Sequence, residues 1–272
     1  MNESDQTPIV LSIVVLTFNE KFDTVRCISS LLEFIDDRSE IILVDNGSSD
    51  GTVEAIGTLS SKVRIFRSDK NLGVGPGRNY GVDQASGEYI MIIDNDTIYY
   101  GPEPVHEIQH LFATLPKAGV IGFQLLNEDG SLQRNFRRFP VFLQPFVARV
   151  SILKKVPFLN SILDSYLMTE VPESDLYSAL EVDFVIGANQ VFSRKEFLRM
   201  GKYDEEMFYG VEDCELCLRF KKEGYKNYYS PAVRIAHVYK RRSRHSLKLF
   251  TSHLFSFVHM FRKHKRVYRL YP

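Results

Sequence analysis

The feature that most constrains the fold is the segment 89–97, Tyr-Ile-Met-Ile-Ile-Asp-Asn-Asp-Thr, which begins as an apolar run and ends in two carboxylates. An apolar run of this length that stops at charge is typical of a strand buried on both faces of a sheet. The carboxyl end of such a strand lies at the crevice where open α/β sheets bind ligands. Asp94 and Asp96 offer hard oxygen ligands, so the segment predicts either a divalent-cation site or a solvated Asp-Asn turn.

Strand and helix patterns alternate through the first hundred residues. Runs rich in Ile, Val and Leu predict strands at 9–18, 41–44 and 63–66, ahead of the run at 89–93. Apolar spacing and capping residues predict the intervening helices, at 23–34, from the turn 45–51 to residue 59, and from the glycine-rich loop 71–79 to residue 85. This alternation is typical of βαβ units and predicts an α/β fold with a mostly parallel central sheet flanked by helices.

The pattern loosens after Asp96. The elements expected there are helices at 104–114, 194–200 and 211–223, and strands at 120–124, 182–189, 225–229 and 233–236. Residues 141–180 contain apolar residues without a clear period, interrupted by three prolines, and we expect them to form helices and a loop over the site. His237 follows the last expected strand directly.

Composition bounds the environment of the chain. Its 272 residues are 44% apolar and 25% charged, as in soluble globular proteins, and no apolar run approaches the length of a transmembrane helix. Three cysteines make no disulfide framework, and residues 1–8 lack the apolar core of a signal peptide, so we expect a cytoplasmic protein. We expect no nucleic-acid partner. Cys214 and Cys217 form a CxxC pair without a second pair to complete a zinc site, so we interpret them as packed thiols.

The zero net charge hides an asymmetry between the body of the chain and its C-terminal tail. Residues 240–272 contain ten of the 34 Lys and Arg residues and none of the 34 Asp and Glu residues, which leaves residues 1–239 at a net charge of −10. Such an asymmetry suggests an anionic partner surface.

The tail also has a helical pattern. Its apolar residues recur at steps of three and four, as Leu247, Phe250, Leu254, Phe257, Val258 and Phe261. Basic residues flank this stripe, namely Arg241, Arg242, Arg244, Arg262, Lys263, Lys265 and Arg266. A basic amphipathic helix within 241–272 predicts peripheral attachment to an anionic membrane surface. Docking of the stripe on the rest of the chain, or on a second subunit in a homodimer, is the alternative of equal weight.

Polar residues at strand ends and helix starts form the candidate site. They are Asp45, Asp94, Asp96, Glu212, Asp213 and His237. The carboxyl ends of parallel strands meet at one edge of a sheet, so these residues are expected to be neighbours. Each has an ordinary alternative. Asp45 caps a turn, the acids at 212–213 complement a helix dipole, and His237 makes a strand-end hydrogen bond.

Several ordered motifs resemble family 2 glycosyltransferases, which have the GT-A fold. The matching segments are 12–20 (Ser-Ile-Val-Val-Leu-Thr-Phe-Asn-Glu), 44–52 (Val-Asp-Asn-Gly-Ser-Ser-Asp-Gly-Thr), 71–73, 77–81, 94–96 and 212–213. The resemblance spans about residues 9–240, and 210–216 with His237 is most similar to the rhamnosyltransferase and galactofuranosyltransferase branch. It implies a GT-A domain at 1–240, with a nucleotide-binding half at 9–97, an acceptor-binding half at 98–240, and a helical tail at 241–272.

The resemblance implies an inverting transfer of a hexose or deoxyhexose from a UDP- or dTDP-sugar, with dTDP-rhamnose favoured, to a hydroxyl of a glycan or lipid-linked acceptor in cell-surface polysaccharide synthesis. Asp213 would be the general base. Asp94, Asp96 and His237 would hold Mn²⁺ or Mg²⁺, which neutralises the diphosphate leaving group. The implied contacts to the donor nucleotide are Thr17, Asn19, Glu20, Asp45, Gly73, Arg78 and Asp94. The implied acceptor side comprises Glu212, Asp183, Gly187 and Ala188.

Three other functions compete with this one. The glycines of 73–77 are similar to a dinucleotide fingerprint, but Arg78 occupies the position of its third glycine, which counts against a Rossmann-type oxidoreductase. The segment 94–96 begins like an EF-hand loop, which then fails at Ile98 and Tyr99. A nucleotide-sugar-binding relative without catalysis is the third, and the acids at 94, 96 and 213 argue against it. The cluster Arg134, Arg137 and Arg138 is either solvated surface or a contact to diphosphate or acceptor.

Overall fold

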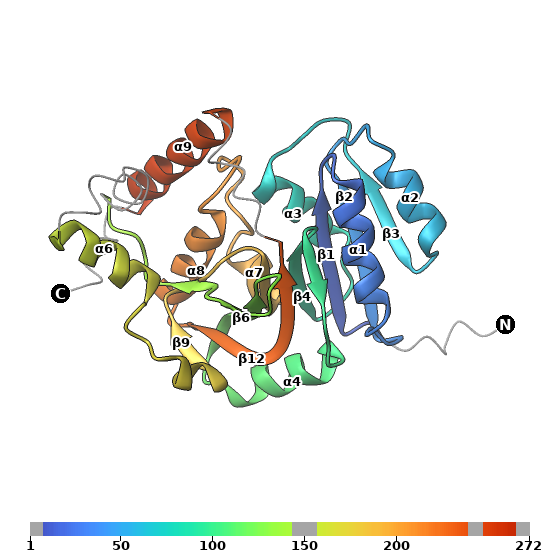
Figure 1. Cartoon of the computed structure of the whole chain (residues 1–272). Coiled ribbons are helices and arrows are strands. Elements are labelled where there is room, and N and C mark those ends of the chain that lie inside the picture. The colour runs from blue at the N-terminus through green and yellow to red at the C-terminus, as the bar shows by residue number, and fades with distance from the viewer. Residues whose placement is uncertain (1–7, 143–156, 239–246, 265–272) are drawn as a thin grey trace.

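The computed structural model describes residues 8–142, 157–238 and 247–264. Within these ranges the chain forms a ten-stranded mixed sheet with helices on both faces, and a separate two-stranded sheet (Figure 1). The strand order along the main sheet is β3-β2-β1-β4-β11-β6-β12-β5, with β7 paired to β6 and β9 paired to β12. The predicted α/β fold is therefore confirmed.

The N-terminal half supplies the regular, parallel part of the sheet. Its elements are β1 (Leu11–Thr17), α1 (Lys21–Leu32), β2 (Ser39–Asp45), α2 (Thr52–Leu59), β3 (Val63–Arg67), α3 (Val74–Asp83) and β4 (Tyr89–Asp94). The parallel registers place Thr17 beside Asp45 and Leu16 beside Asp94. The carboxyl ends of β1, β2 and β4 therefore meet at one edge, as the sequence predicts.

The C-terminal half is less regular. Its first elements are β5 (Thr97–Tyr99), α4 (Pro104–Thr114), β6 (Ala118–Leu126), β7 (Leu132–Gln133), β8 (Phe136–Arg137), α6 (Pro157–Leu167) and a short 3-10 helix, η2 (Glu173–Tyr177). The later ones are β9 (Leu180–Val182), β10 (Phe184–Val185), β11 (Asn189–Ser193), α7 (Arg194–Arg199), α8 (Glu212–Lys222), β12 (Lys226–His237) and α9 (Leu247–Lys263). β11 runs antiparallel to both β4 and β6, so the sheet becomes mixed where β11 joins it.

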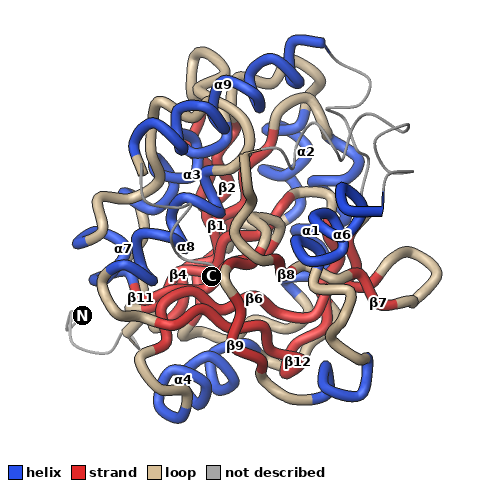
Figure 2. Tube along the Cα trace, turned by 90° about the vertical axis from the view of Figure 1, so that its left-hand side faces the viewer, coloured by secondary structure: helices blue, strands red, loops and turns tan. Residues whose placement is uncertain are grey.

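Alternating residues of the central strands fill two hydrophobic cores, one on each face of the sheet. Val14 and Ile92 belong to the core that also contains Phe197 of α7 and Leu216 of α8, together with apolar residues of α9. Their neighbours along the strands, such as Ile13, belong to the core covered by α1, α2 and α4. Both views show α9 and α4 at opposite ends of the molecule (Figure 1, Figure 2). A sheet covered on both faces explains why β4 is a continuous apolar run.

Two expectations for the C-terminal half are wrong. The segment 182–189 is not one strand but parts of three, because β9 pairs with β12, β10 with β8 and β11 with β4. Asp183 separates the first two, with its carboxylate accepting from the Phe139 amide at 3.1 Å and its carbonyl accepting from the Asn227 side chain at 2.8 Å. Conversely, 225–229 and 233–236 belong to a single strand, β12, whose pairing with β6 shifts register between residues 230 and 234.

One other expectation is confirmed, because Cys214 and Cys217 are buried free thiols in α8. Of the helices and loop expected at 141–180, the structure contains the helices α6 and η2, while residues 143–156 lie outside the described ranges. Most of the basic flanks of the tail, at 241–244 and 265–266, also lie outside them.

Candidate active site

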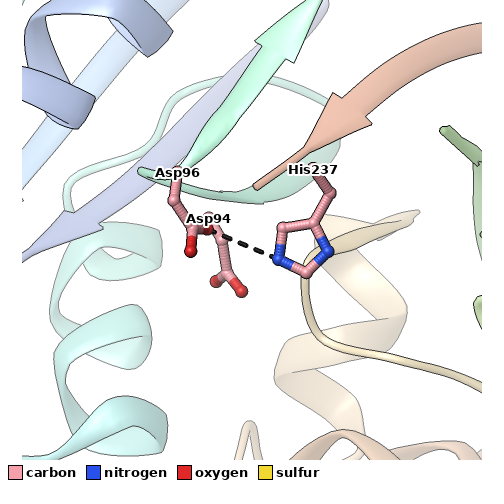
Figure 3. A group of neighbouring side chains, drawn as sticks. All are labelled: Asp94, Asp96 and His237. Carbon is pink, nitrogen blue, oxygen red and sulfur yellow. Dashed lines mark ion pairs between the residues drawn. The ribbon is translucent and has the colours of Figure 1, made fainter. Parts of the chain in front are cut away.

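The charged turn after β4 is fixed by three neighbouring segments. The Asp94 amide donates to the Ala188 carbonyl at 3.0 Å, and the Thr97 hydroxyl donates to the Asp94 carbonyl at 2.7 Å. Asn95, between the two aspartates, donates from Nδ2 to the Thr24 hydroxyl of α1 at 3.1 Å. The Asp94 and Asp96 side chains lie beside each other and face the His237 ring (Figure 3).

Asp94, Asp96 and His237 form a cluster at the ends of β4 and β12. One ligand atom from each residue lies within 4.8 Å of the others, and His237 Nε2 is 3.4 Å from Asp96 Oδ1. The pairing of β12 with β5 brings His237 there, opposite Thr97. Two carboxylates and an imidazole suit Mn²⁺, and the carboxylates suit Mg²⁺. Within the described ranges, the side chains therefore form a site that fits a divalent cation.

The His237 ring is buried but strongly influenced by the acids beside it. Burial disfavours the imidazolium, yet the hydrogen bond and charge of Asp96 outweigh burial and raise the pKa of His237. On the other edge of the ring, Nδ1 lies 2.7 Å from Gln133 Oε1 of β7. Binding of a cation at Nε2 requires the neutral ring, so protonation at low pH competes with the metal.

Arg78 of α3 connects this cluster to the start of α8. Its guanidinium is buried and donates from Nη2 to Asp94 Oδ1 at 2.6 Å and to the Gly187 carbonyl at 2.9 Å. Nη1 donates to Glu212 Oε1 at 3.1 Å, and the guanidinium lies 5.8 Å from the centre of the Tyr203 ring. A Cβ on Gly187 would lie 2.5 Å from Nη1, so the glycine provides the space that Arg78 occupies.

Glu212, the first residue of α8, is almost fully buried. Burial raises its pKa to about 7, and the charge of Asp213 acts in the same direction, while Arg78 opposes both. One of its carboxylate oxygens, Oε2, has no partner within the described residues. Glu212 therefore carries a proton over part of the neutral pH range.

Asp213 sits in the first turn of α8, with its carboxylate directed by two backbone amides. Oδ2 accepts from the Gly187 amide at 2.8 Å, and Oδ1 accepts from the Cys214 amide at 2.7 Å. The chain enters the helix through two left-handed residues, Gly210 (φ +81°) and Val211 (φ +61°). Asp213 is thus held rigidly on the Gly187 side of the cluster.

The predicted nucleotide pocket lies at the ends of β1 and β2. Asp45 is fully buried, accepts from the Ser48 amide at 3.0 Å and pairs with Arg67 at 3.3 Å, so it does cap a turn. Asn19, in a left-handed conformation, accepts from the Ser49 amide at 2.8 Å. These turns place the Asp45 and Asn19 side chains at the same edge of the sheet. We call it the donor edge, after the nucleotide-sugar donor that the sequence predicts there.

Thr17, Glu20 and Gly73 complete that edge. The Thr17 hydroxyl lies 2.7 Å from the hydroxyl of Thr24, and Asn95 Nδ2 is 3.4 Å from Glu20 Oε2. Gly73 has φ +95°, and a Cβ there would lie 2.5 Å from the Phe208 carbonyl oxygen, so only glycine fits at the start of α3.

The predicted acceptor residues do not all come together. Glu212, Gly187 and Ala188 contact the cluster described above, directly or through Arg78. Asp183 instead pairs with Lys221 at 2.6 Å. Lys221 lies near the C-terminal end of α8, roughly 12 Å along the helix axis from Asp213. Among the basic residues, Arg134 is engaged by the carbonyls of Met168 and Val171, which favours a structural part for it.

Sequence reasoning passed over three residues that the structure brings to the site. Gln133 contacts His237, Asn95 ties the acidic turn to α1, and Tyr203 packs against Arg78. Asn95 could have been noticed from its position between two aspartates. Gln133 and Tyr203 carry no local signal, because their partners lie about a hundred residues away in the chain.

The fold and the acidic edge of the sheet define the class of GT-A glycosyltransferases. This chain superposes on a crystal structure of GalNAc-T7 with UDP, GalNAc and Mn²⁺, with a TM-score of 0.66 and 17% identity. The superposition covers 95% of this chain and 48% of the GalNAc-T7 chain. A mannosyltransferase from Pyrobaculum calidifontis, in complex with GDP-Man and Mn²⁺, gives a TM-score of 0.62 at 18% identity and covers 96% of this chain and 67% of its own.

Residues 12–197 match glycosyl transferase family 2, and the chain belongs to that family. It is therefore a glycosyltransferase, and the predicted family is confirmed. An N-acetylglucosaminyl-diphospho-decaprenol L-rhamnosyltransferase of Mycobacterium tuberculosis is 25% identical over 240 residues, which are 84% of this chain and 76% of the relative. A poly-beta-1,6-N-acetyl-D-glucosamine synthase of Staphylococcus aureus is 23% identical over 81% of this chain and 48% of its own length. In the parts of this chain that the structure describes, none of the helices is long and apolar enough to cross a bilayer.

Proposed function

We propose that the protein transfers a sugar, with inversion, from a UDP- or dTDP-sugar to a hydroxyl group of a lipid-linked glycan acceptor in polysaccharide synthesis. The observation that carries this proposal is the chain of contacts from Asp213 through Gly187 and Arg78 to Asp94. It holds a carboxylate suited to a general base next to a cluster suited to a diphosphate-bound cation. That is the arrangement that a single displacement at an anomeric carbon requires.

Each group has a proposed part in the transfer. Asp213 accepts the proton of the acceptor hydroxyl as its oxygen attacks the anomeric carbon, and one displacement inverts that carbon. Mn²⁺ or Mg²⁺, held by Asp94, Asp96 and His237, neutralises charge on the leaving diphosphate when it is bound. Arg78 acts on the donor through Asp94, since its guanidinium already contacts that carboxylate and Glu212.

The donor edge supports the nucleotide part of the proposal. Asp45 retains acceptor capacity beyond its bonds to Ser48, because a carboxylate has about four lone-pair sites. We propose that it accepts from the N3–H of uracil or thymine, with Thr17, Asn19 and Glu20 beside it and Gly73 allowing close approach. The name of the rhamnosyltransferase relative favours a rhamnose donor, for which we propose dTDP-rhamnose, and a polyprenyl-diphosphate glycan as the acceptor. Such an acceptor places the protein in the cytoplasm, at the inner face of the membrane.

A donor screen tests the proposal. The protein is melted with Mn²⁺ and, in turn, UDP-galactose, UDP-N-acetylglucosamine, UDP-glucose, UDP-galactofuranose and dTDP-rhamnose, and nucleoside diphosphate release is then assayed with a lipid-linked glycan. We expect dTDP-rhamnose to raise the melting temperature and to be turned over, since a ligand that binds only the folded state stabilises it. A shift without release in any condition would favour a binding-only relative. No shift with any of the five donors would contradict the donor class.

A further inference from the structure

Helix α9 has two faces of different character. Its inner face buries Ser256, Phe257, Met260 and Phe261. Phe257 and Phe261 pack against Phe142, with ring centres 6.3 Å and 5.7 Å apart, and the Ser256 hydroxyl donates to the Tyr209 carbonyl at 3.2 Å. Two of the six residues of the predicted apolar stripe, Phe257 and Phe261, are therefore buried against the rest of the chain.

The inner face also holds the loop 201–211 that leads into α8. A Cβ on Gly210 would lie 2.3 Å from the His253 ring, so α9 and the entry to α8 are in direct contact. Lys263 pairs with Asp204 of this loop at 2.6 Å and with Glu215 of α8 at 3.1 Å. These contacts fix α9 to the element that carries Asp213.

The outer face of α9 is apolar and exposed. Leu247 is 77% exposed and Phe255 is 64% exposed, which is unusual for large apolar side chains. Leu254, Phe255 and Val258 line a shallow groove of about 330 Å³, together with Thr251, His259 and Arg262. We define this outer face by Leu247, Thr251, Leu254, Phe255 and Val258. An apolar face of this kind on a soluble domain marks an interaction surface.

The positive charge around the outer face indicates which kind of partner binds there. Lys248 and Arg262, both exposed, lie near its two ends, and residues 240–272 contain ten basic and no acidic residues. A second copy of the chain would bring the same cations against these, so repulsion disfavours a dimer through this face. An anionic bilayer offers both an apolar layer and negative charge, and it attracts basic residues near its surface.

We propose that the outer face of α9 docks on an anionic lipid bilayer. The inner face then holds the loop before Asp213 against that membrane-bound helix. The inference deepens the proposed function, on which its biological meaning rests, because a lipid-linked acceptor is anchored in the same bilayer. Binding itself needs neither sugar donor nor acceptor, so it can be tested independently of sugar transfer.

Flotation of the full chain with vesicles tests the docking. The vesicles are phosphatidylcholine with or without phosphatidylglycerol, at low and high salt. We expect flotation with the anionic vesicles at low salt only. Leu254→Ser combined with Phe255→Ser should weaken binding at least about tenfold, because both side chains lose the apolar burial that the bilayer would give them. The matched control is Tyr177→Ser on η2, where the 83% exposed Tyr177 lies away from α9 in the chain.

The outcomes separate cleanly. Equal flotation of the double variant and the wild type would overturn the proposal, as would failure of the wild type to bind anionic vesicles. Equal binding to neutral vesicles would overturn the part played by charge. If sedimentation shows that the double variant converts a dimer to a monomer, the occupant is a second copy instead. Near-native melting curves verify that the variants are folded, and a third variant, Leu247→Ser, provides the test if the pair does not fold.

A second inference comes from the hairpin that precedes β8. Gln133 Nε2 donates to Asn127 Oδ1 at 2.9 Å, which leaves Oε1 as the atom that faces His237. The Asn127 amide side chain is fixed in turn by the Ser131 hydroxyl at 2.9 Å. His237 Nδ1 then donates to Gln133 at 2.7 Å, so in the neutral ring Nε2 carries the lone pair, on the side of Asp96. We infer that Gln133 is a positioning residue that fixes the His237 tautomer for cation binding.

Manganese affinity tests this positioning directly. Gln133→Met removes the acceptor with little change in side-chain length, and Gln133→Glu keeps it. We expect Mn²⁺ binding, measured by electron paramagnetic resonance on the protein alone, to weaken about 10–100-fold in the Met variant and to recover in the Glu variant. Wild-type affinity in a folded Met variant would overturn the inference, and so would equal loss in both variants.

Discussion

The donor edge and the acceptor side of the site are held together in different ways. On the donor edge, Asp45 accepts from the Ser48 amide, three residues on, and Asn19 accepts from the Ser49 amide, 30 residues on but just beyond the end of the paired strand β2. On the acceptor side, Asp213 accepts from the Gly187 amide, 26 residues away, and Glu212 accepts from the buried Arg78, 134 residues away. The parallel pairing of β1 with β2 is thus enough to bring Asn19 and Asp45 to one edge, whereas the acceptor side depends on a buried guanidinium that joins α3 to α8. Changes on the donor edge should mainly affect ligands, and changes on the acceptor side should also affect folding.

The largest effect is expected at Asp96. Asp96→Ala removes one ligand of the cation cluster while leaving the sheet contacts in place, so transfer should fall by at least about 10³-fold with a near-native melting curve. Initial rates of nucleoside diphosphate release with Mn²⁺ measure it. Full activity of the wild type in excess EDTA would contradict the metal assignment.

Asp213→Asn tests the acceptor side of the comparison. The amide keeps an acceptor for the Gly187 amide but cannot take a proton, so the rate should fall by about 10²–10⁴-fold. The melting shift caused by the donor should stay unchanged, since the proposed base acts on the acceptor and not on the donor. Normal turnover would move the base to another residue, such as Glu212 or Asp183.

Arg78→Met tests whether the buried contacts of the acceptor side carry stability. Removal of one partner leaves Glu212 and Asp94 without a counter-charge, and we expect a loss of about 3 kcal/mol in the free energy of unfolding. Lys202→Met, which removes the surface ion pair with Asp83, is the control and should cost less than about 1 kcal/mol. Urea titration measures both, and similar losses would show that the buried ion pairs of Arg78 contribute no more stability than a surface ion pair.

The pH dependence of stability should report on Glu212. Its pKa is raised from 4.5 to about 7, so the folded protein binds this proton more tightly than the unfolded chain does. The resulting stabilisation is complete below pH 4.5 and is lost as the pH rises through about 7. The free energy of unfolding of Glu212→Gln, relative to that of the wild type, should therefore increase by about 2 kcal/mol from acidic to mildly alkaline pH. Parallel stability curves for the two proteins across this range would show that burial of Glu212 has little effect.

The smallest effects are expected at two helical glycines of the N-terminal half. A Cβ on Gly57 of α2 would meet no neighbouring atom within 4 Å in the described structure, so Gly57→Ala should stabilise by about 0.5–1 kcal/mol. A Cβ on Gly81 of α3 would lie 2.5 Å from Val14 Cγ1, so Gly81→Ala should destabilise by about 1–3 kcal/mol. Thermal melts of both variants measure the sign. The same sign for both would show that α3 does not need its close approach to the sheet.

Much of the N-terminal half could be predicted from local sequence patterns. The strands of 9–94 lie within a few residues of their predicted positions, because each is an apolar run of consecutive residues that ends at turn-forming residues. The proximity of 94–96 to His237 could also be predicted, since a parallel sheet brings strand ends to one edge. The roles of the individual residues in the transfer stay predictions until they are measured.

The sequence by itself determined the α/β class, the acidic edge of the sheet and the amphipathic tail, because periodicity and turn chemistry act over a few neighbouring residues. Tertiary structure alone decided that Arg78 is buried between Asp94 and Glu212 and that Gln133 contacts His237. It also decided that Phe257 of the tail is buried while Phe255 stays exposed. The physical reason is that two side chains about a hundred residues apart in the chain meet only through the packing of helices and strands. Local sequence patterns contain no information on that packing.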